Sequence, residues 1–291
     1  MIQSKIVPGI LSLLGRLPLP ILYILASAIA WVLCRSQSRA KKITQRNLEA
    51  CFPQISTEDR QKLQDQSLAE MAKTGVEMLY FWQCSQKKLR QCVSRIQGQE
   101  AFELAKKQGK GVLLLGPHLG AWELVNLYFS PMTAMYDPPK FLGLEHLMKS
   151  ARQRFGSTLV PADRAGVKAL FRALGRGEVV GLLPDQDPGH EVGSGFAHFF
   201  GVPALTMTLP IRLVQKKKIP SFYAFAERHA GGGFVLHFIP VNNEFYDERE
   251  DLALRALNAG IEKCIEYCPA QYQWSYKRFK RRPEGRGDFY A

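Results

Sequence analysis

The sequence predicts an α/β fold in which helices flank a largely parallel or mixed β-sheet. From residue 96 onward, short apolar runs of strand length alternate with segments of helical periodicity, the pattern of an α/β domain. The 291 residues are 46% hydrophobic and 22% charged, as in globular proteins. No linker rich in Gly, Pro or Ser marks a second globular domain. The composition therefore excludes a disordered tail, a collagen and a coiled coil.

The N-terminal segment is apolar enough to contact lipid. Residues 17–33 (LPLPILYILASAIAWVL) contain no charged side chain and stand at the short limit of the roughly 17–25 residues that span a bilayer. Five basic residues follow the apolar run before the first acid, Glu49: Arg35, Arg39, Lys41, Lys42 and Arg46. The positive-inside rule then places the chain after residue 34 in the cytoplasm. We expect a transmembrane or membrane-anchoring helix in residues 1–34 and a cytoplasmic-face domain in residues 35–291.

Two alternatives exist for this segment. A secretory signal peptide is disfavoured, because the start of the chain is weakly basic and the flank after the apolar run is strongly basic. A buried or interfacial helix, entered at Pro18 and Pro20, is the second alternative and stays open.

The other elements follow in order along the chain. Residues 35–95 are expected to be helical, and Ser56 or Thr57 is suited to cap a helix with acids in its first turn. The further helix candidates are Glu100–Lys107, Ala121–Tyr128, Leu147–Phe155, Val167–Leu174, Ala204–Val214 and Asp251–Tyr267. The strand candidates are the apolar run GVLLLG at 111–116, Phe141–Leu144, Thr158–Val160, Val179–Leu183, Ser221–Ala226 and Phe234–Val241. The last two strands, joined through three glycines, indicate an antiparallel hairpin.

The charge and the cysteines restrict the class of partner. Lys and Arg number 39 against 26 acidic residues, a formal charge of +13, which favours phosphates, an anionic membrane, nucleic acid or an acidic protein. Nucleic acid is disfavoured, because the basic residues are not interleaved with a base-stacking aromatic motif. The six cysteines form no C-x-x-C pair, and no His stands at zinc-ligand spacing, so we expect reduced thiols and no metal.

The stretch GVLLLGPHLGAWEL carries the strongest chemical signal. It places His118 and Glu123 directly after a buried strand, where open α/β sheets usually bind ligands. Positions five apart do not face each other on one helix, so the two meet only if His118 lies in the loop and Glu123 in the next helix. Glu123 would then accept a hydrogen bond from the imidazole and make His118 a general base. The alternative is a half-buried His and a Glu favoured by the helix dipole.

Three ordered motifs strengthen this interpretation through a resemblance to a known family. They are GPHLGAWE at 116–123, LPDQD at 183–187 with FFGVPA at 199–204, and PAQYQW at 269–274 with the basic residues that follow it. Together they resemble the late acyltransferases of lipid A biosynthesis in Gram-negative bacteria, a branch of the glycerolipid acyltransferase superfamily with its His-x4-Asp/Glu box. The likeness extends from the N-terminal apolar segment to residue 284.

The resemblance implies a glycerolipid-acyltransferase-like fold and an enzyme of the bacterial inner membrane that acts on the cytoplasmic side. A fatty acyl group would move from acyl carrier protein to the hydroxyl of a 3-hydroxyacyl chain on a phosphorylated lipid A precursor. His118 and Glu123 would form the catalytic pair, and acyl carrier protein, the precursor and membrane lipids would be the partners. No cofactor or metal is implied, because the thioester carries the activation. A glycerophospholipid or another glycolipid acceptor is the alternative.

Charged residues elsewhere are candidates for substrate binding. Arg154 and Arg164 are expected to bind substrate, and Arg164 opens a helix, a position suited to a phosphate. Asp185 and Asp187 follow a buried strand and would orient Arg164 or the substrate, unless they cap the next turn. Two segments depart from the family pattern, residues 138–145 and Gln215–Lys218, and the first leaves the counterpart of the family's arginines open.

Overall fold

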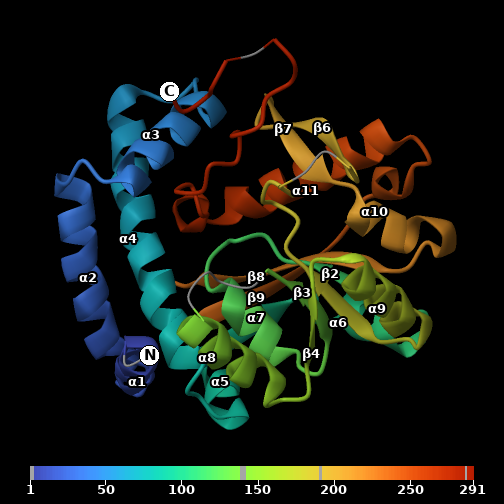
Figure 1. The fold of residues 1–291 in the computed structure, drawn as a ribbon, viewed down its shortest axis with the longest axis horizontal. Helices are drawn as coiled ribbons and strands as arrows, with labels where there is room; N and C mark the ends of the chain where they lie inside the picture. Colours follow the sequence, from blue (N-terminus) through green and yellow to red (C-terminus); the bar gives the residue numbers. More distant parts are fainter. Residues whose placement is uncertain (1–2, 138–141, 190–191, 286) are drawn as a thin grey trace.

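A seven-stranded mixed sheet organises the computed structural model, which describes residues 3–137, 142–189, 192–285 and 287–291 (Figure 1). The strand order is β1-β9-β8-β2-β5-β3-β4, and a separate pair, β6 and β7, lies outside this sheet. Strands β8, β2, β5, β3 and β4 run parallel, whereas β9 is antiparallel to β8 and parallel to β1. The carboxyl ends of the five parallel strands therefore meet at one edge of the sheet.

The elements have the following bounds. The strands are β1 Val93–Gln97, β2 Val112–Leu115, β3 Thr133–Tyr136, β4 Thr158–Pro161, β5 Val179–Leu182, β6 Ser194–Phe199, β7 Val202–Met207, β8 Ser221–Arg228 and β9 Phe234–Pro240. The helices are α1 Gln3–Leu14, α2 Leu19–Arg35, α3 Arg39–Cys51, α4 Thr57–Phe81, α5 Gln86–Cys92, α6 Gln99–Lys107, α7 Trp122–Tyr128, α8 Leu142–Gln153, α9 Arg164–Gly175, α10 Leu209–Val214 and α11 Glu250–Tyr267.

Strand β2 shows why the sheet needs helices on both faces. All four of its residues are buried, and they alternate between two hydrophobic clusters. Leu113 and Leu115 join the cluster formed with α9, α10 and α11, whereas Val112 and Leu114 join the cluster formed with α4, α6, α7 and α8. Because side chains alternate across a strand, a continuous apolar run fits a strand covered on both faces. The expected α/β fold with a mixed sheet is confirmed.

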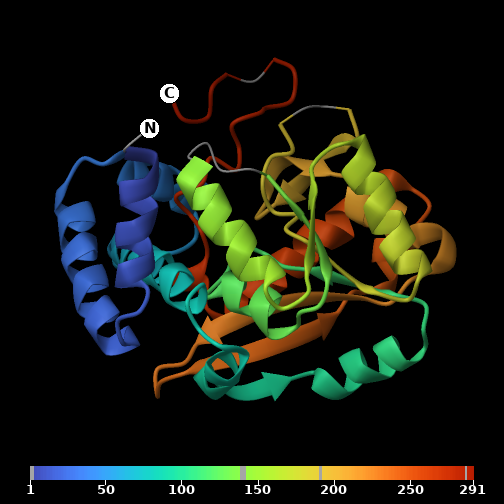
Figure 2. The same cartoon turned by 60° about the horizontal axis from the view of Figure 1, so that its bottom comes forward.

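Helices α1 and α2 lie at one end of the molecule, and α4 separates α2 from the sheet (Figures 1 and 2). Helix α2 buries Leu22, Ala26 and Ala30 on this side. Its other faces and those of α1 expose large apolar side chains: Val7, Ile10, Leu13, Ile21, Ile24, Leu25, Ile29, Trp31 and Val32. Helix α2 is thus a packed helix that still presents an apolar surface.

The membrane-spanning helix expected in residues 1–34 stays a prediction. Among the described residues no single helix has the length and apolarity to cross a bilayer. Helices α2 and α3 meet those criteria only as a pair, and they are bent by 73° relative to each other. The bend falls at the start of the basic segment, where Ser38 caps α3 by accepting a hydrogen bond from the Lys41 amide.

Most of the expected elements are present, and the differences have clear reasons. The strand expected at Phe141–Leu144 is wrong from Leu142 onward, where α8 begins, and Phe141 lies outside the described residues. The helix expected over Ala204–Val214 is wrong in its first half, which is strand β7; only Leu209–Val214 is helical. Strands β1, β3 and β6 were not predicted, because each is short and only partly buried. The helical structure expected over residues 35–95 is wrong at 93–95, where β1 begins. The antiparallel β8–β9 hairpin is confirmed, and all six cysteines are free of disulfides.

Candidate active site

The loop between β2 and α7 places His118 at the carboxyl edge of the sheet. Gly120 in this loop has φ +62°, and a Cβ atom there would lie 2.0 Å from the Ala226 carbonyl oxygen, so only glycine fits. The Gly120 amide donates to the Gln271 carbonyl oxygen at 3.0 Å, and the Ala121 amide donates to that of Ala226 at 2.8 Å. The loop is therefore fixed to strand β8 and to the C-terminal part of the chain.

A buried ion-pair network supports the same loop from α4. The Arg228 guanidinium, at the end of β8, bonds Glu77 at 2.6 Å and Glu70 at 2.7 Å, and it also donates to the Thr74 hydroxyl. The Thr74 hydroxyl lies 3.3 Å from the Gly120 carbonyl oxygen. Because these charges are paired inside the protein, the network fixes the position of α4 relative to the loop.

The partner of the His118 side chain is Asp185, in the turn after β5. Nδ1 of His118 lies 2.8 Å from Oδ1 of Asp185, and the His118 backbone amide donates to Oδ2 at 2.8 Å. Burial raises the pKa of the Asp185 carboxyl, but the charge and hydrogen bonds of His118 outweigh it, so the pKa is lowered. An ionised Asp185 accepts the Nδ1 proton, which leaves the Nε2 lone pair of a neutral His118 available as a base.

Two other side chains complete the surroundings of the imidazole. Nε2 of His118 lies 3.3 Å from the side-chain nitrogen of Gln186, and that nitrogen donates to Oε1 of Gln273 at 3.1 Å. The Trp122 indole packs edge-on against the imidazole, with 5.1 Å between ring centroids. Neither glutamine was singled out from the sequence, although both lie in the motifs that carry the family resemblance.

Glu123 does not bond His118, and the hydrogen bond predicted between them is wrong. Its carboxylate is 1% exposed and forms a two-pronged ion pair with Arg152, at 2.9 and 2.6 Å. The Trp82 indole donates to the same carboxylate at 3.0 Å. Glu123 opens α7 and faces α4 and α8, whereas His118 faces β5. The Arg152 guanidinium lies over the Trp122 ring at 5.6 Å, so Glu123 reaches His118 only through Arg152 and Trp122.

Comparisons with known proteins identify the family of the chain. The model of the family "Bacterial lipid A biosynthesis acyltransferase" matches residues 3–281. The chain belongs to this family. It is 31% identical to the lipid A biosynthesis palmitoleoyltransferase of Escherichia coli (strain K12), over 97% of this chain and 92% of that protein. It is 30% identical to the lipid A biosynthesis lauroyltransferase of the same strain, over 95% of this chain and 91% of that protein.

A further relative is the lipid A biosynthesis myristoyltransferase of Escherichia coli (strain K12), 25% identical over 82% of this chain and 75% of that protein. The relatives thus include three acyltransferases whose names state different acyl groups. This chain is an acyltransferase of lipid A biosynthesis, and the resemblance read from its motifs is confirmed.

Arg154 of this lipid A acyltransferase has a structural position. Its guanidinium donates to the Trp82 carbonyl oxygen at 2.7 Å, to that of Phe81 at 3.0 Å and to that of Cys84. These carbonyl groups end α4, where unpaired backbone acceptors attract a cation. The structure therefore assigns the Arg154 guanidinium to the α4 terminus, and its expected role in substrate binding stays a prediction.

Arg164 and Asp187 lie farther from the imidazole. Arg164 is exposed at the first position of α9, capped by Asp163. It follows β4, three strands from β2, or about 14 Å at the usual strand spacing. Asp187 accepts a hydrogen bond from the Gly189 amide at 2.8 Å, as the turn-capping alternative predicts. Neither aspartate contacts Arg164: Asp185 bonds His118, and Asp187 lies 3.6 Å from Lys280 and 3.5 Å from Arg281.

An apolar pocket begins beside the His118 loop of the acyltransferase and extends between the sheet and α7. Its lining is mostly apolar and comes from β2, α7, β3, β5 and β8: Leu114, Gly116, Trp122, Val125, Asn126, Met132, Ala134, Gly181, Leu182, Leu183 and Ala224. Trp122 belongs both to this lining and to the imidazole surroundings. Met132 packs closely against Gly181, since a Cβ there would lie 3.1 Å from the Met132 sulfur.

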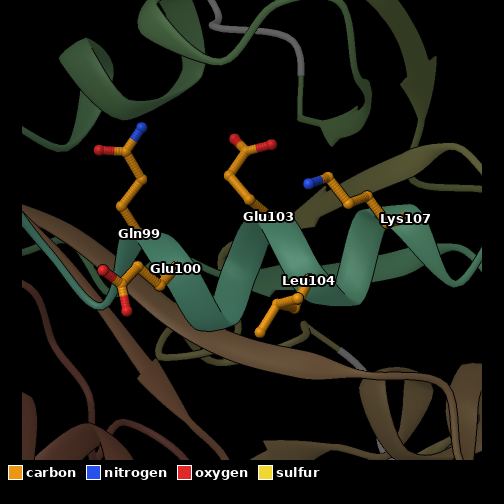
Figure 3. Close-up of a pocket in the computed structure, with 5 residues that line it drawn as sticks. All are labelled: Gln99, Glu100, Glu103, Leu104 and Lys107. Carbon is orange, nitrogen blue, oxygen red and sulfur yellow. The ribbon is translucent and has the colours of Figure 1, made fainter.

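A second depression lies along α6 and does not resemble a catalytic site. It is lined by Gln99, Glu100, Glu103, Leu104 and Lys107, all from one helix. Figure 3 shows that these side chains spread away from one another instead of converging on a common point. Helix α6 precedes β2, so it lies toward the amino end of the strand that carries His118 at its other end.

Proposed function

We propose that this acyltransferase moves a fatty acyl group from the thioester of acyl carrier protein to the hydroxyl of a 3-hydroxyacyl chain on a lipid A precursor. His118 acts as the general base, and Asp185 orients it. The observation that supports this assignment is the 2.8 Å contact between Nδ1 of His118 and Asp185, at the mouth of an apolar pocket. A base beside an apolar pocket suits a substrate with a fatty chain.

The reaction needs one base and no further activation of the donor. The acceptor hydroxyl attacks the thioester carbonyl carbon and gives its proton to Nε2 of His118. The resulting tetrahedral oxyanion collapses, the C–S bond breaks, and the imidazolium returns the proton to the leaving thiolate. Asp185 stabilises the imidazolium in between, as carboxylates do in other His-based sites. No cofactor or metal enters the scheme, because the thioester is already activated.

Backbone amides of the His118 loop are poor candidates for the oxyanion donor. The amides of His118, Leu119, Gly120 and Ala121 donate to Asp185 and to the carbonyl oxygens of Pro117, Gln271 and Ala226, respectively. An arginine is the better candidate, and Arg152 is the cation nearest to the Trp122 wall among the contacts of the site. Glu123 is a positioning residue in this scheme, since it holds Arg152 in place.

The apolar pocket is proposed to open into the site of the acyl chain. Its volume of about 40 Å³ is far below that of a fatty acyl chain, so binding must widen it. Its wall residues Met132, Ala134 and Gly181 come from the segment before α8 and from β5, away from the loop that carries His118. An acyl chain whose carbonyl group lies beside His118 would extend along Trp122 toward these residues. The depth of the pocket would then set the preferred chain length.

Helices α1 and α2 are proposed to hold the enzyme on the cytoplasmic face of the bacterial inner membrane. Their exposed apolar side chains would enter the lipid, and the basic residues from Arg35 onward would contact anionic headgroups. The net charge of +13 suits the other proposed partners as well, because acyl carrier protein is acidic and the precursor is phosphorylated. The exposed Arg164 is proposed to contact an acceptor phosphate.

The decisive experiment uses the purified full-length protein with acyl-acyl carrier protein and a defined lipid A precursor. Mass spectrometry is expected to show the precursor gain one acyl chain, and His118→Ala should abolish this gain while the protein stays folded. Acylation of a glycerophospholipid in place of the precursor would support the alternative acceptor. Wild-type turnover by His118→Ala would refute the assignment of the base.

A further inference from the structure

The side-chain amide of Gln186 lies against Nε2 of His118, the nitrogen that is proposed to act as the base. Its nitrogen lies 3.3 Å from Nε2 of the imidazole and 3.1 Å from Oε1 of Gln273. An NH2 group has two hydrogens, so it can donate to both atoms at once. Asp185 accepts the Nδ1 proton on the far side of the ring, which leaves Nε2 as an acceptor in the neutral imidazole.

The orientation of this amide follows from its neighbours. If the Gln186 amide were reversed, its oxygen would face both the Gln273 side-chain oxygen and the Nε2 lone pair, and neither contact would carry a hydrogen. The Gln273 backbone is held beside the imidazole, because its amide donates to the His118 carbonyl oxygen at 3.0 Å. Side-chain hydrogen bonds thus connect four residues in series: Asp185, His118, Gln186 and Gln273.

We infer that Gln186 caps the base in the resting enzyme and that the acceptor hydroxyl must displace it. This inference rests on the proposed function, in which Nε2 takes the proton of the acceptor. A hydroxyl that donates to Nε2 needs a position about 2.6–3.2 Å from that nitrogen, which the Gln186 amide now fills. A water molecule must also displace the Gln186 amide to reach Nε2. Unlike the lipid acceptor, it has no acyl chain whose contacts with the protein would offset the lost hydrogen bond.

The cap makes Gln186 a positioning residue with two measurable effects. While it is in place, the Nε2 lone pair is shielded from small electrophiles as well as from the acceptor. When Gln186 is replaced, the acceptor hydroxyl can bond Nε2 without first breaking the hydrogen bond between Gln186 and Nε2. A neutral hydrogen bond contributes about 0.5–1.5 kcal/mol net, so each effect should be about 2- to 10-fold.

The first test measures the cap without measuring catalysis. Diethyl pyrocarbonate acylates the unprotonated imidazole nitrogen, and peptide mass spectrometry gives the modification rate of each histidine. In Gln186→Ala we expect His118 to react about 2- to 10-fold faster than in the wild type. His229 is exposed and serves as the internal reference, and Gln61→Ala, an exposed position on α4, is the matched control.

Gln186→Glu tests the direction of the hydrogen bond. A carboxylate cannot donate to Nε2 and instead favours the protonated imidazole, so His118 should react more slowly than in the wild type. Gln273→Leu removes the acceptor that holds the amide and should give a smaller increase than Gln186→Ala. An unchanged His118 rate in folded Gln186→Ala would overturn the cap.

The second test measures displacement. With acyl donor saturating, KM for the lipid acceptor should fall about 2- to 10-fold in Gln186→Ala, and kcat should change little. A KM that rises would show that Gln186 binds the acceptor, which overturns the inference. The two tests separate the cap from the proposed function. If His118 is modified faster in Gln186→Ala but His118→Ala keeps full activity, the proposed function is refuted and the cap is supported.

Discussion

His118 and Asp185 are 67 positions apart in the chain, yet Nδ1 of the imidazole lies 2.8 Å from the carboxylate. The contact exists because β2 and β5 are adjacent parallel strands whose carboxyl ends carry the two residues. A second hydrogen bond, from the His118 backbone amide, fixes the carboxylate relative to the loop as well as to the ring. Asp185 thus sets both the tautomer of the His118 imidazole and the position of the His118 backbone.

Asp185→Asn should lower acyl transfer nearly as much as His118→Ala, by about 10²- to 10⁴-fold. An Asn amide can donate to Nδ1, which would place the proton on Nε2 and remove the base. The double variant should be no worse than the weaker single variant, because the two residues act as a unit. Steady-state kinetics measure the effect, and Asp163→Asn, which changes the α9 cap, is the control. Near wild-type kcat in Asp185→Asn would contradict the orienting role.

The sequence was sufficient to place the His118 imidazole at a strand end but not to identify its partner. A buried strand followed by Gly116-Pro117-His118 predicts an imidazole at a strand end, and this is a local property of the chain. Which strand lies next to β2 depends on the crossover connections, which the sequence does not show. Asp185 was therefore recognised as a strand-end residue, but its expected partner was Arg164 or the substrate and not His118. Glu123 was wrongly paired with His118 for a similar reason. Its carboxylate forms an ion pair with the buried Arg152 of α8, a helix far from it in the sequence.

Glu123→Ala should damage the fold more than Asp185→Asn does. Removing one member of a buried ion pair leaves the other charge without a partner, at a cost of about 3–5 kcal/mol in the free energy of unfolding. Thermal and denaturant unfolding measure this change. The double variant Glu123→Ala with Arg152→Met should recover part of the stability, since no charge is then left buried. Full stability in the single variant would show that water reaches this pair.

Ala134→Leu should shift the donor preference toward shorter acyl chains. The added side chain projects into the wall of the apolar pocket, and each methylene that is excluded removes about 0.8 kcal/mol of binding. Competition between acyl donors of several lengths, followed by mass spectrometry of the products, measures the shift. Ala105→Leu is the control, because Ala105 is buried in the same cluster but does not line the pocket. Equal shifts in both variants would argue against this pocket as the acyl site.

The double variant Ile24→Asp with Trp31→Asp should weaken binding to vesicles that contain anionic lipids by at least about tenfold. Both side chains are exposed on α2, at 72% and 59%, and burying an apolar side chain contributes about 1.5–3 kcal/mol. Sedimentation with vesicles measures the bound fraction, and it should be compared at low and high salt. Phe171→Asp on α9 is the matched control, since Phe171 is also an exposed apolar residue. Unchanged binding at high salt would place the membrane contact elsewhere.

Arg164→Ala tests whether the exposed end of α9 binds an acceptor phosphate. If the guanidinium binds the phosphate equally in the ground state and the transition state, KM for the acceptor should rise and kcat should be preserved. Lys at this position keeps the charge but loses the planar fork that holds two phosphate oxygens, so Arg164→Lys should restore binding only in part. Arg172→Ala, on the same helix but in its last turn, is the control.

The decisive comparison for Arg164 uses acceptors with and without the phosphate. Wild-type enzyme should bind the phosphorylated acceptor more tightly, and Arg164→Ala should lose that preference while its KM for the dephosphorylated acceptor stays close to the wild-type value. We expect kcat to be preserved because Arg164 follows β4, three strands from the strand that precedes His118, and has no contact with the residues around the imidazole among those described. If Arg164→Ala loses the same factor on both acceptors, Arg164 does not recognise the phosphate.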